Sequence, residues 1–93
     1  MQTEEILSIL KIDLQISSPK YDTYLGHLIT LAKRAIEKEG IILFVSIEDG
    51  MLVEMYAAYL YRKRRGECAV MPRPLRYMLN NRLMSQKAGN ADG

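Results

Sequence analysis

The stretch that decides the fold is Met51–Tyr61, MLVEMYAAYLY, in which every residue except Glu54 is apolar. Ser46 precedes it, and an aspartate three positions further on completes a pattern similar to a capping box, which marks the start of a helix. Gly66 follows it, and glycine is typical of the position just beyond a helix. We therefore predict a helix from Ser46 to about Arg65. Because it is apolar on all sides, it must be surrounded. So short a chain offers few elements to cover it, so we expect part of its surface to contact another subunit.

The length and composition favour one small all-α domain. Typical domains hold about 100 to 200 residues, so a chain of 93 residues forms one domain at most. Helix-forming residues are plentiful and valine is scarce. We predict a bundle of about four helices over residues 1–84. The last nine residues, SQKAGNADG, contain no large apolar side chain, so we expect residues 85–93 to form a flexible C-terminal tail.

Three further helices are marked by caps and periodicity. Thr3 can cap a short first helix that ends near Leu10. The second helix has Ser18 as its cap, Pro19 at its first position and Gly40 just beyond its end. Its apolar face, with helical spacing, consists of Tyr21, Leu25, Leu28, Ile29, Ala32, Ala35 and Ile36. The fourth helix starts at Pro72 or Pro74, and its predicted inner face consists of Leu75, Met78, Leu79 and Leu83.

Two connections remain between these helices. Residues 11–18 alternate apolar and polar side chains, and we predict an extended linker with buried anchors there. Residues 41–45 are continuously apolar, and we predict a buried connection.

The residues that carry enzyme chemistry are few. The chain has one histidine, His27, and one cysteine, Cys68, so it lacks the convergent donors that a metal site needs. Neither a glycine-rich phosphate loop nor a serine-centred nucleophile elbow is present in the sequence. We predict no enzyme activity, no metal and no cofactor. An enzyme that uses Cys68 as a nucleophile is the weakest of the alternatives.

Charge is polarised along the chain. Residues 1–50 carry 5 basic and 8 acidic side chains, whereas residues 51–93 carry 8 basic and 3 acidic ones. The basic side chains of the second half that are candidates for contact with a partner or a nucleic acid are Arg62, Lys63, Arg64, Arg65, Arg73, Arg76, Arg82 and Lys87. The run Arg62–Arg65 could bind nucleic-acid phosphates or a protein, or could simply match the negative end of its helix dipole.

Part of the sequence resembles a known family. LVEMYAAYLYRKRRGE, at residues 52–67, and MPRPLRYMLNNRLMSQK, at residues 71–87, resemble the small head–tail connector, or adaptor, proteins of tailed bacteriophages and prophages. The most telling pieces are AAYLYRKR, from Ala57, and PRPLRYMLNNRL, from Pro72. The likeness extends more weakly over about residues 3–87. The apolar run Ile41–Ile47 is more hydrophobic than that family's interhelical loop is expected to be.

The resemblance implies a structural protein at the head–tail junction of a virion. Its subunits form a homo-oligomeric ring of about a dozen copies beneath the portal protein, with heterologous contacts between neighbours. The ring extends the DNA conduit and binds the next head-completion or tail protein. DNA passes through without sequence-specific binding. By the same analogy, Arg73–Lys87 are candidates for docking on the portal.

These expectations also concern the location and the subunit contacts. No apolar run approaches the length of a membrane span, and the N-terminus begins with acidic residues, so we expect a cytosolic protein without membrane association. The resemblance further implies that the ring assembles in the host bacterial cytoplasm. Candidate subunit-interface residues lie off the apolar stripe of the second helix and on the apolar third helix: Tyr24, Leu31, Met51, Met55, Tyr56 and Tyr59.

The alternative function is a small nucleic-acid-binding regulator that uses the basic run at residues 62–65.

Overall fold

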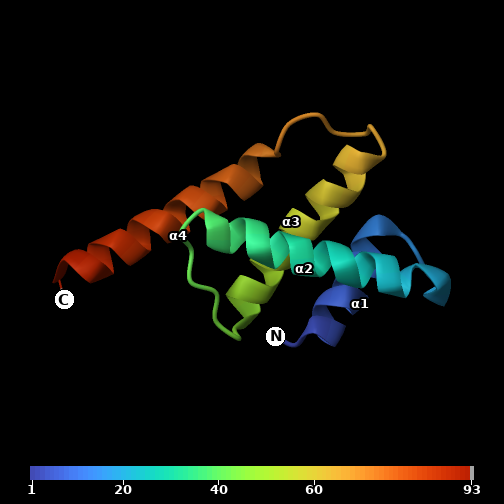
Figure 1. Cartoon of the computed structure of the whole chain (residues 1–93), viewed down its shortest axis with the longest axis horizontal. Coiled ribbons are helices and arrows are strands. Elements are labelled where there is room, and N and C mark those ends of the chain that lie inside the picture. The colour runs from blue at the N-terminus through green and yellow to red at the C-terminus, as the bar shows by residue number, and fades with distance from the viewer. Residues whose placement is uncertain (93) are drawn as a thin grey trace.

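The computed structural model describes residues 1–92, with side chains as far as residue 88, and all of its regular elements are helical (Figure 1). No strand occurs in these residues. The elements are α1 (Thr3–Leu14), the short 3-10 helix η1 (Pro19–Tyr21), α2 (Asp22–Lys38), α3 (Ile47–Arg64) and α4 (Arg73–Asp92). The predicted all-α fold with four main helices is confirmed.

The ends of α3 lie where the sequence places them. The Ser46 side-chain oxygen accepts a hydrogen bond from the backbone N–H of Asp49 at 3.1 Å, which satisfies one of the free amides of the first turn. Gly66 follows the C-terminal end with φ of 77°, a left-handed conformation that costs glycine little. These local signals act within a few residues, so they can be recognised without knowledge of the tertiary structure.

The starts of the first two helices differ slightly from the prediction. Gln2, rather than Thr3, occupies the N-cap of α1, and its backbone N–H donates to the Glu5 carboxylate at 3.3 Å. Ser18 and Pro19 begin the 3-10 turn η1, and the α-helical pattern starts only at Asp22.

The predicted extended linker at residues 11–18 is wrong over its first half. Helix α1 continues to Leu14 and ends at Gln15, whose φ of 59° is left-handed. The reason is that Ile6, Leu10 and Leu14 recur every four residues and form one helical stripe facing the core. Ile12 contributes to the alternating pattern but is 78% exposed, so the alternation does not reflect burial.

The predicted buried connection at residues 41–45 is also wrong. Ile41 enters the core and Leu43 packs half-buried against it, but the other three residues are exposed. We use the name apolar loop for residues 42–47, in which the large side chains of Ile42, Phe44, Val45 and Ile47 are exposed. A short connection between two helices can turn only some of its side chains toward the core, so the rest face solvent.

Helix α3 is central, and the chain itself covers its apolar surface. It contacts α1, α2 and α4, and Ala57 and Ala58 allow close approach of the neighbouring helices. Every side chain in the segment 51–61 is buried or half-buried. The expectation that this helix needs another subunit to cover it is therefore wrong, because small residues let three helices pack tightly around it.

Helix α4 packs through one stripe only. Leu75 and Leu79 are fully buried, and its C-terminal half extends beyond the other helices (Figure 1). The helix continues through Ser85 to Asp92, so the described part of the predicted tail is helical. The side chains of residues 89–92 and all of Gly93 lie outside the described residues.

Candidate interaction surfaces

The basic run at the end of α3 is divided among several local partners. Arg62 Nη2 lies 3.9 Å from an Asp13 carboxylate oxygen, and Arg65 Nε lies 2.6 Å from a Glu67 oxygen. The Glu67 carboxylate and the Tyr61 hydroxyl both raise the pKa of Arg65. Consecutive residues point in different directions around a helix, so the run does not form one basic face.

Aromatic rings account for the rest of the run. The Lys63 ammonium lies 5.7 Å from the centre of the Tyr59 ring, and the Arg64 guanidinium lies 6.0 Å from that of Tyr24. Such cation–π contacts contribute roughly 0.5 to 1 kcal/mol at exposed sites. Lys63 and Arg64 nevertheless remain exposed, so a role in binding a protein or a nucleic acid stays a prediction.

The basic residues of α4 fall into two classes. Two of the predicted contact residues, Arg76 and Arg82, form ion pairs with Glu39 and Asp49 instead and fix α4 to the rest of the chain. Arg73 and Lys87 are exposed and make no ion pair with the described side chains. Among the basic residues of α4, Arg73 and Lys87 are therefore the two that remain available for a partner.

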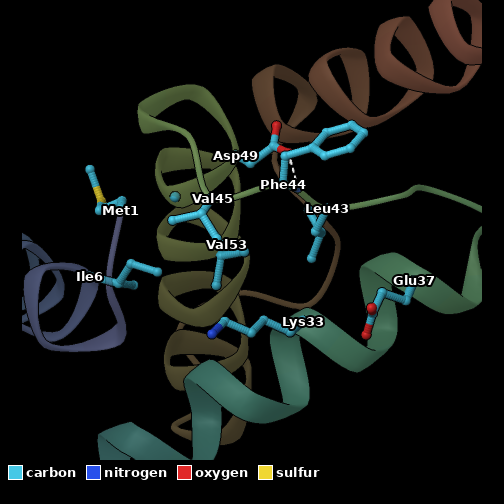
Figure 2. Close-up of a pocket in the computed structure, with 10 residues that line it drawn as sticks. Met1, Ile6, Lys33, Glu37, Leu43, Phe44, Val45, Asp49 and Val53 are labelled. Atoms are coloured by element: carbon cyan, nitrogen blue, oxygen red, sulfur yellow. Dashed lines mark hydrogen bonds between the residues drawn. The ribbon is translucent and has the colours of Figure 1, made fainter.

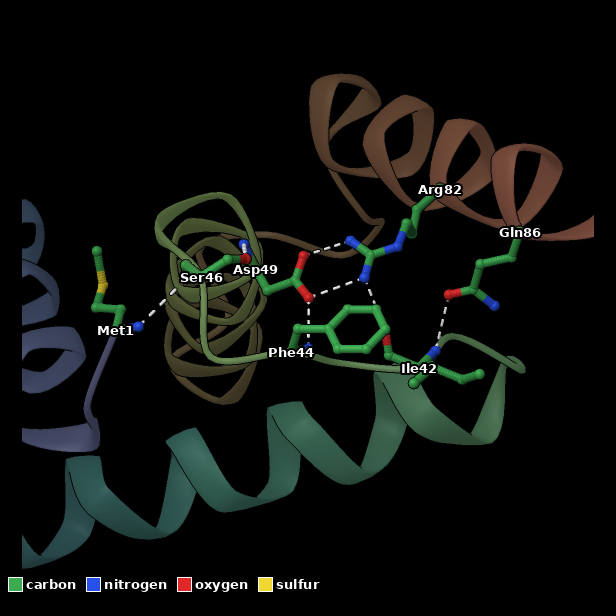
Figure 3. A network of polar contacts seen from close by, with 7 residues as sticks. All are labelled: Met1, Ile42, Phe44, Ser46, Asp49, Arg82 and Gln86. Carbon is green, nitrogen blue, oxygen red and sulfur yellow. Dashed lines mark hydrogen bonds and ion pairs between the residues drawn. The ribbon is translucent and has the colours of Figure 1, made fainter. Parts of the chain in front are cut away.

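Asp49 is the centre of a buried polar network (Figure 3). Its side chain accepts hydrogen bonds from the Arg82 guanidinium and, at 2.6 Å, from the backbone N–H of Phe44. The hydrogen bond from Arg82 lowers the pKa of Asp49, and burial opposes this effect. Arg82 also donates to the Ile42 carbonyl at 2.7 Å, so one arginine links α4 both to α3 and to the apolar loop.

Gln86 adds a second attachment of α4 (Figure 3). Its side-chain amide donates to the Gly40 carbonyl at 3.0 Å, and its oxygen accepts from the backbone N–H of Ile42 at 2.8 Å. These bonds satisfy backbone groups that the turn would otherwise leave unpaired. The apolar loop is thus held in a defined conformation although its side chains face outward.

A pocket of about 220 Å³ opens beside the apolar loop (Figure 2). Leu43, Phe44 and Val45 line one side of it, and Met1, Ile6 and Val53 line the opposite side, while Lys33 and Glu37 of α2 and Asp49 and Gly50 of α3 complete the lining. The sequence signal for this surface was the continuous apolar run Ile41–Val45, which we interpreted as buried. The run indicates an exposed apolar surface instead.

The predicted subunit-interface residues are not one surface. Tyr24 and Leu31 on α2 are 37% and 46% exposed, as an interface would require. Met51 and Met55 are half-buried. Tyr56 and Tyr59 are below 10% exposed, and their rings pack edge to face at 5.8 Å. Assignment of these two tyrosines to a subunit interface is wrong, because they are part of the core of the chain itself.

A buried acidic residue was not singled out as a functional site from the sequence. Glu54 on α3 is 3% exposed, and its Oε2 atom has no hydrogen-bond partner. Burial, together with the neighbouring Asp13 carboxylate of α1, raises the pKa of Glu54 to about 7, and the Arg62 charge opposes this rise. The available signal was its position as the one charged residue in Met51–Tyr61.

The remaining reactive side chains do not converge. Cys68 is half-buried, and its thiol donates to the Val70 carbonyl at 2.9 Å, whereas His27 is exposed on α2. Among the side chains of residues 1–88, no three from His, Cys, Asp or Glu lie close enough together to hold a metal ion. Among the same residues, no helix is long and apolar enough to cross a bilayer.

Comparisons with family models, with curated proteins and with solved structures find no match to this chain. The functional argument therefore depends on its own sequence and geometry.

Proposed function

We propose that this chain is a structural head–tail connector (adaptor) subunit of a tailed bacteriophage or prophage. About a dozen copies form a closed ring with heterologous contacts under the portal, extend the DNA conduit and link the capsid to the tail. The partners are other copies of the chain, the portal protein and the next head-completion or tail protein. DNA passes without sequence-specific contacts. The ring assembles in the host bacterial cytoplasm and resides at the head–tail junction.

One observation carries this proposal: exposed apolar side chains gather on more than one surface, and two of these surfaces differ in character. The first is the apolar loop. The second is the outer face of α4, where Tyr77 is 61% and Met84 is 69% exposed. A subunit of a ring needs two unlike surfaces, because each copy contacts one neighbour with the first surface and the other neighbour with the second. The sequence resemblance at residues 52–67 and 71–87 indicates which kind of ring this is.

The test is assembly with and without a portal. Sedimentation velocity over a concentration series measures self-association, and electron microscopy of the chain mixed with portal rings from the same phage shows whether it adds a layer. We expect association that increases with concentration and an added ring on the portal. A strictly monomeric chain that leaves portal rings unchanged would refute the proposal.

The alternative function, a nucleic-acid-binding regulator, is favoured by the exposure of Lys63, Arg64 and Arg65. It predicts DNA binding whose log affinity falls linearly with log salt concentration. Replacement of the run Arg62–Arg65 by glutamine would then abolish binding. A connector predicts weak binding to free DNA, so the same titration separates the two functions.

A further inference from the structure

The pocket beside the apolar loop lies at an acidic end of the molecule. The amine of Met1 donates to the Ser46 carbonyl at 3.4 Å, which brings the first turns of α1 and α3 together. These two turns carry the exposed carboxylates of Glu4, Glu5 and Glu48. These three carboxylates outnumber the two positive groups beside the pocket, the Met1 amine and the Lys33 ammonium, so a partner for this surface should be basic as well as apolar.

The pocket itself has room for a large apolar side chain. Its volume is about 220 Å³, and a cavity of about 150 Å³ already accommodates a benzene ring. Val45 on the rim is 78% exposed and Phe44 is 64% exposed (Figure 2). An aromatic or methionine side chain in the pocket would bury both.

The outer face of α4 has the complementary character. Tyr77 and Met84 are seven positions apart and share one face of the helix, about half a turn away from Arg82. Residues 73–88 contain four basic side chains and no acidic one. Two of the four, Arg73 and Lys87, are exposed and have no ionic partner among the described side chains.

We propose that the outer face of α4 in one copy docks into the pocket beside the apolar loop of the next copy. The contact is between copies, because Arg82 and Gln86 hold the opposite face of α4 against the loop of the same chain. Each copy uses its helix toward one neighbour and its loop toward the other, and such a head-to-tail contact forms a ring when the rotation per subunit closes. This inference rests on the proposed function and specifies the subunit contact.

A matched pair of substitutions tests the loop side of this contact. Val45 and Ile12 are both 78% exposed, so Val45→Asp and Ile12→Asp should both leave the folded chain intact. We expect Val45→Asp to weaken self-association at least tenfold in sedimentation experiments, whereas Ile12→Asp leaves it unchanged. Equal effects of the two substitutions, or no effect of Val45→Asp, would overturn the inference.

Cysteine pairing tests which surfaces meet. In a Cys68→Ala background, one preparation carries Val45→Cys and another carries Met84→Cys. We expect disulfide-linked dimers after the two are mixed under mild oxidation, and few in either preparation alone. Crosslinking of the Val45→Cys preparation with itself would show a loop-to-loop contact and overturn the inference.

The two proposals fail in distinguishable ways. If Val45→Asp still forms rings on the portal with normal affinity between copies, the docking inference is wrong and the connector function stands. If the unmodified chain neither self-associates nor adds to the portal, both are wrong. Met84→Asp provides a second test of the helix side, because its side chain is 69% exposed and the substitution should not unfold the chain.

Discussion

Replacement of the buried acid Glu54 by glutamine should change how the stability of the chain depends on pH. The pKa of Glu54 lies near 7 in the folded chain because the carboxyl group is buried and faces Asp13. In the unfolded chain the carboxyl group returns to the ordinary value of about 4.5. Between these two values the folded state holds a proton that the unfolded state has released. The free energy of unfolding therefore falls as pH rises from about 4.5 to about 7.

The size of the effect follows from the two pKa values. A tenfold change in proton affinity corresponds to about 1.4 kcal/mol, so a rise from 4.5 to about 7 corresponds to roughly 3 kcal/mol of stability lost by pH 8. Glutamine keeps the shape of the protonated acid and does not titrate. We expect Glu54→Gln to match the unmodified chain near pH 4.5 and to exceed it by roughly 3 kcal/mol at pH 8.

Urea unfolding at pH 4.5, 6 and 8 measures this difference, with protein concentration held constant because self-association also adds stability. The comparison of variant with parent cancels the contribution of Asp49, whose lowered pKa has the opposite sign and stabilises the chain above pH 4. A constant difference between Glu54→Gln and the parent from pH 4.5 to 8 would show that folding does not raise the pKa of Glu54, and the reasoning would fail.

Three further substitutions test the packing and the polar network. Leu79→Ala removes a fully buried side chain of α4 and should lower the free energy of unfolding by about 2 to 5 kcal/mol in thermal or urea unfolding. The control Leu31→Ala, at a 46% exposed site, should change it by less than about 0.5 kcal/mol. Equal losses would place Leu79 outside the core. Arg82→Met leaves the buried Asp49 carboxylate without its cation and should lower the free energy of unfolding by about 3 kcal/mol at pH 7. Combination with Asp49→Asn should restore part of that stability. A double variant no more stable than Arg82→Met would argue against the pairing. Gly26→Ala should raise the free energy of unfolding by about 0.5 to 1 kcal/mol, since an added Cβ on this helical residue meets no atom within 4 Å; a lower melting temperature would contradict this.

The sequence predicted the fold wherever the deciding interaction is local. The cap at Ser46 and the left-handed Gly66 lie within one turn of the helix they limit, so their meaning does not depend on the rest of the chain. Residues 11–14 were misread because Ile12 completes an alternating pattern by coincidence, and only the packing of α1 on its neighbours shows that Leu10 and Leu14 are the inward residues.

The candidate surfaces were harder to predict because they depend on how the helices cover one another. A run of apolar residues shows the same sequence pattern whether the folded chain buries it or leaves it exposed. Tyr56 and Tyr59 are enclosed because Ala57 and Ala58 let other helices approach, whereas Phe44 contacts the Arg82 guanidinium at 5.6 Å from its ring centre and stays 64% exposed. Likewise, nothing in the spacing of the α4 arginines indicates that Asp49, more than 30 positions earlier, pairs with one of them.

The hydrogen bonds of Asp49 couple the motions of the apolar loop and α4. This carboxylate accepts from Phe44 in the apolar loop and from Arg82 in α4, while its own backbone N–H completes the cap at Ser46. Rearrangement of the loop and release of the helix both break bonds to the same group, so neither is free to proceed alone. The amide protons of the two segments should therefore exchange with solvent as one cooperative unit, with a common opening free energy.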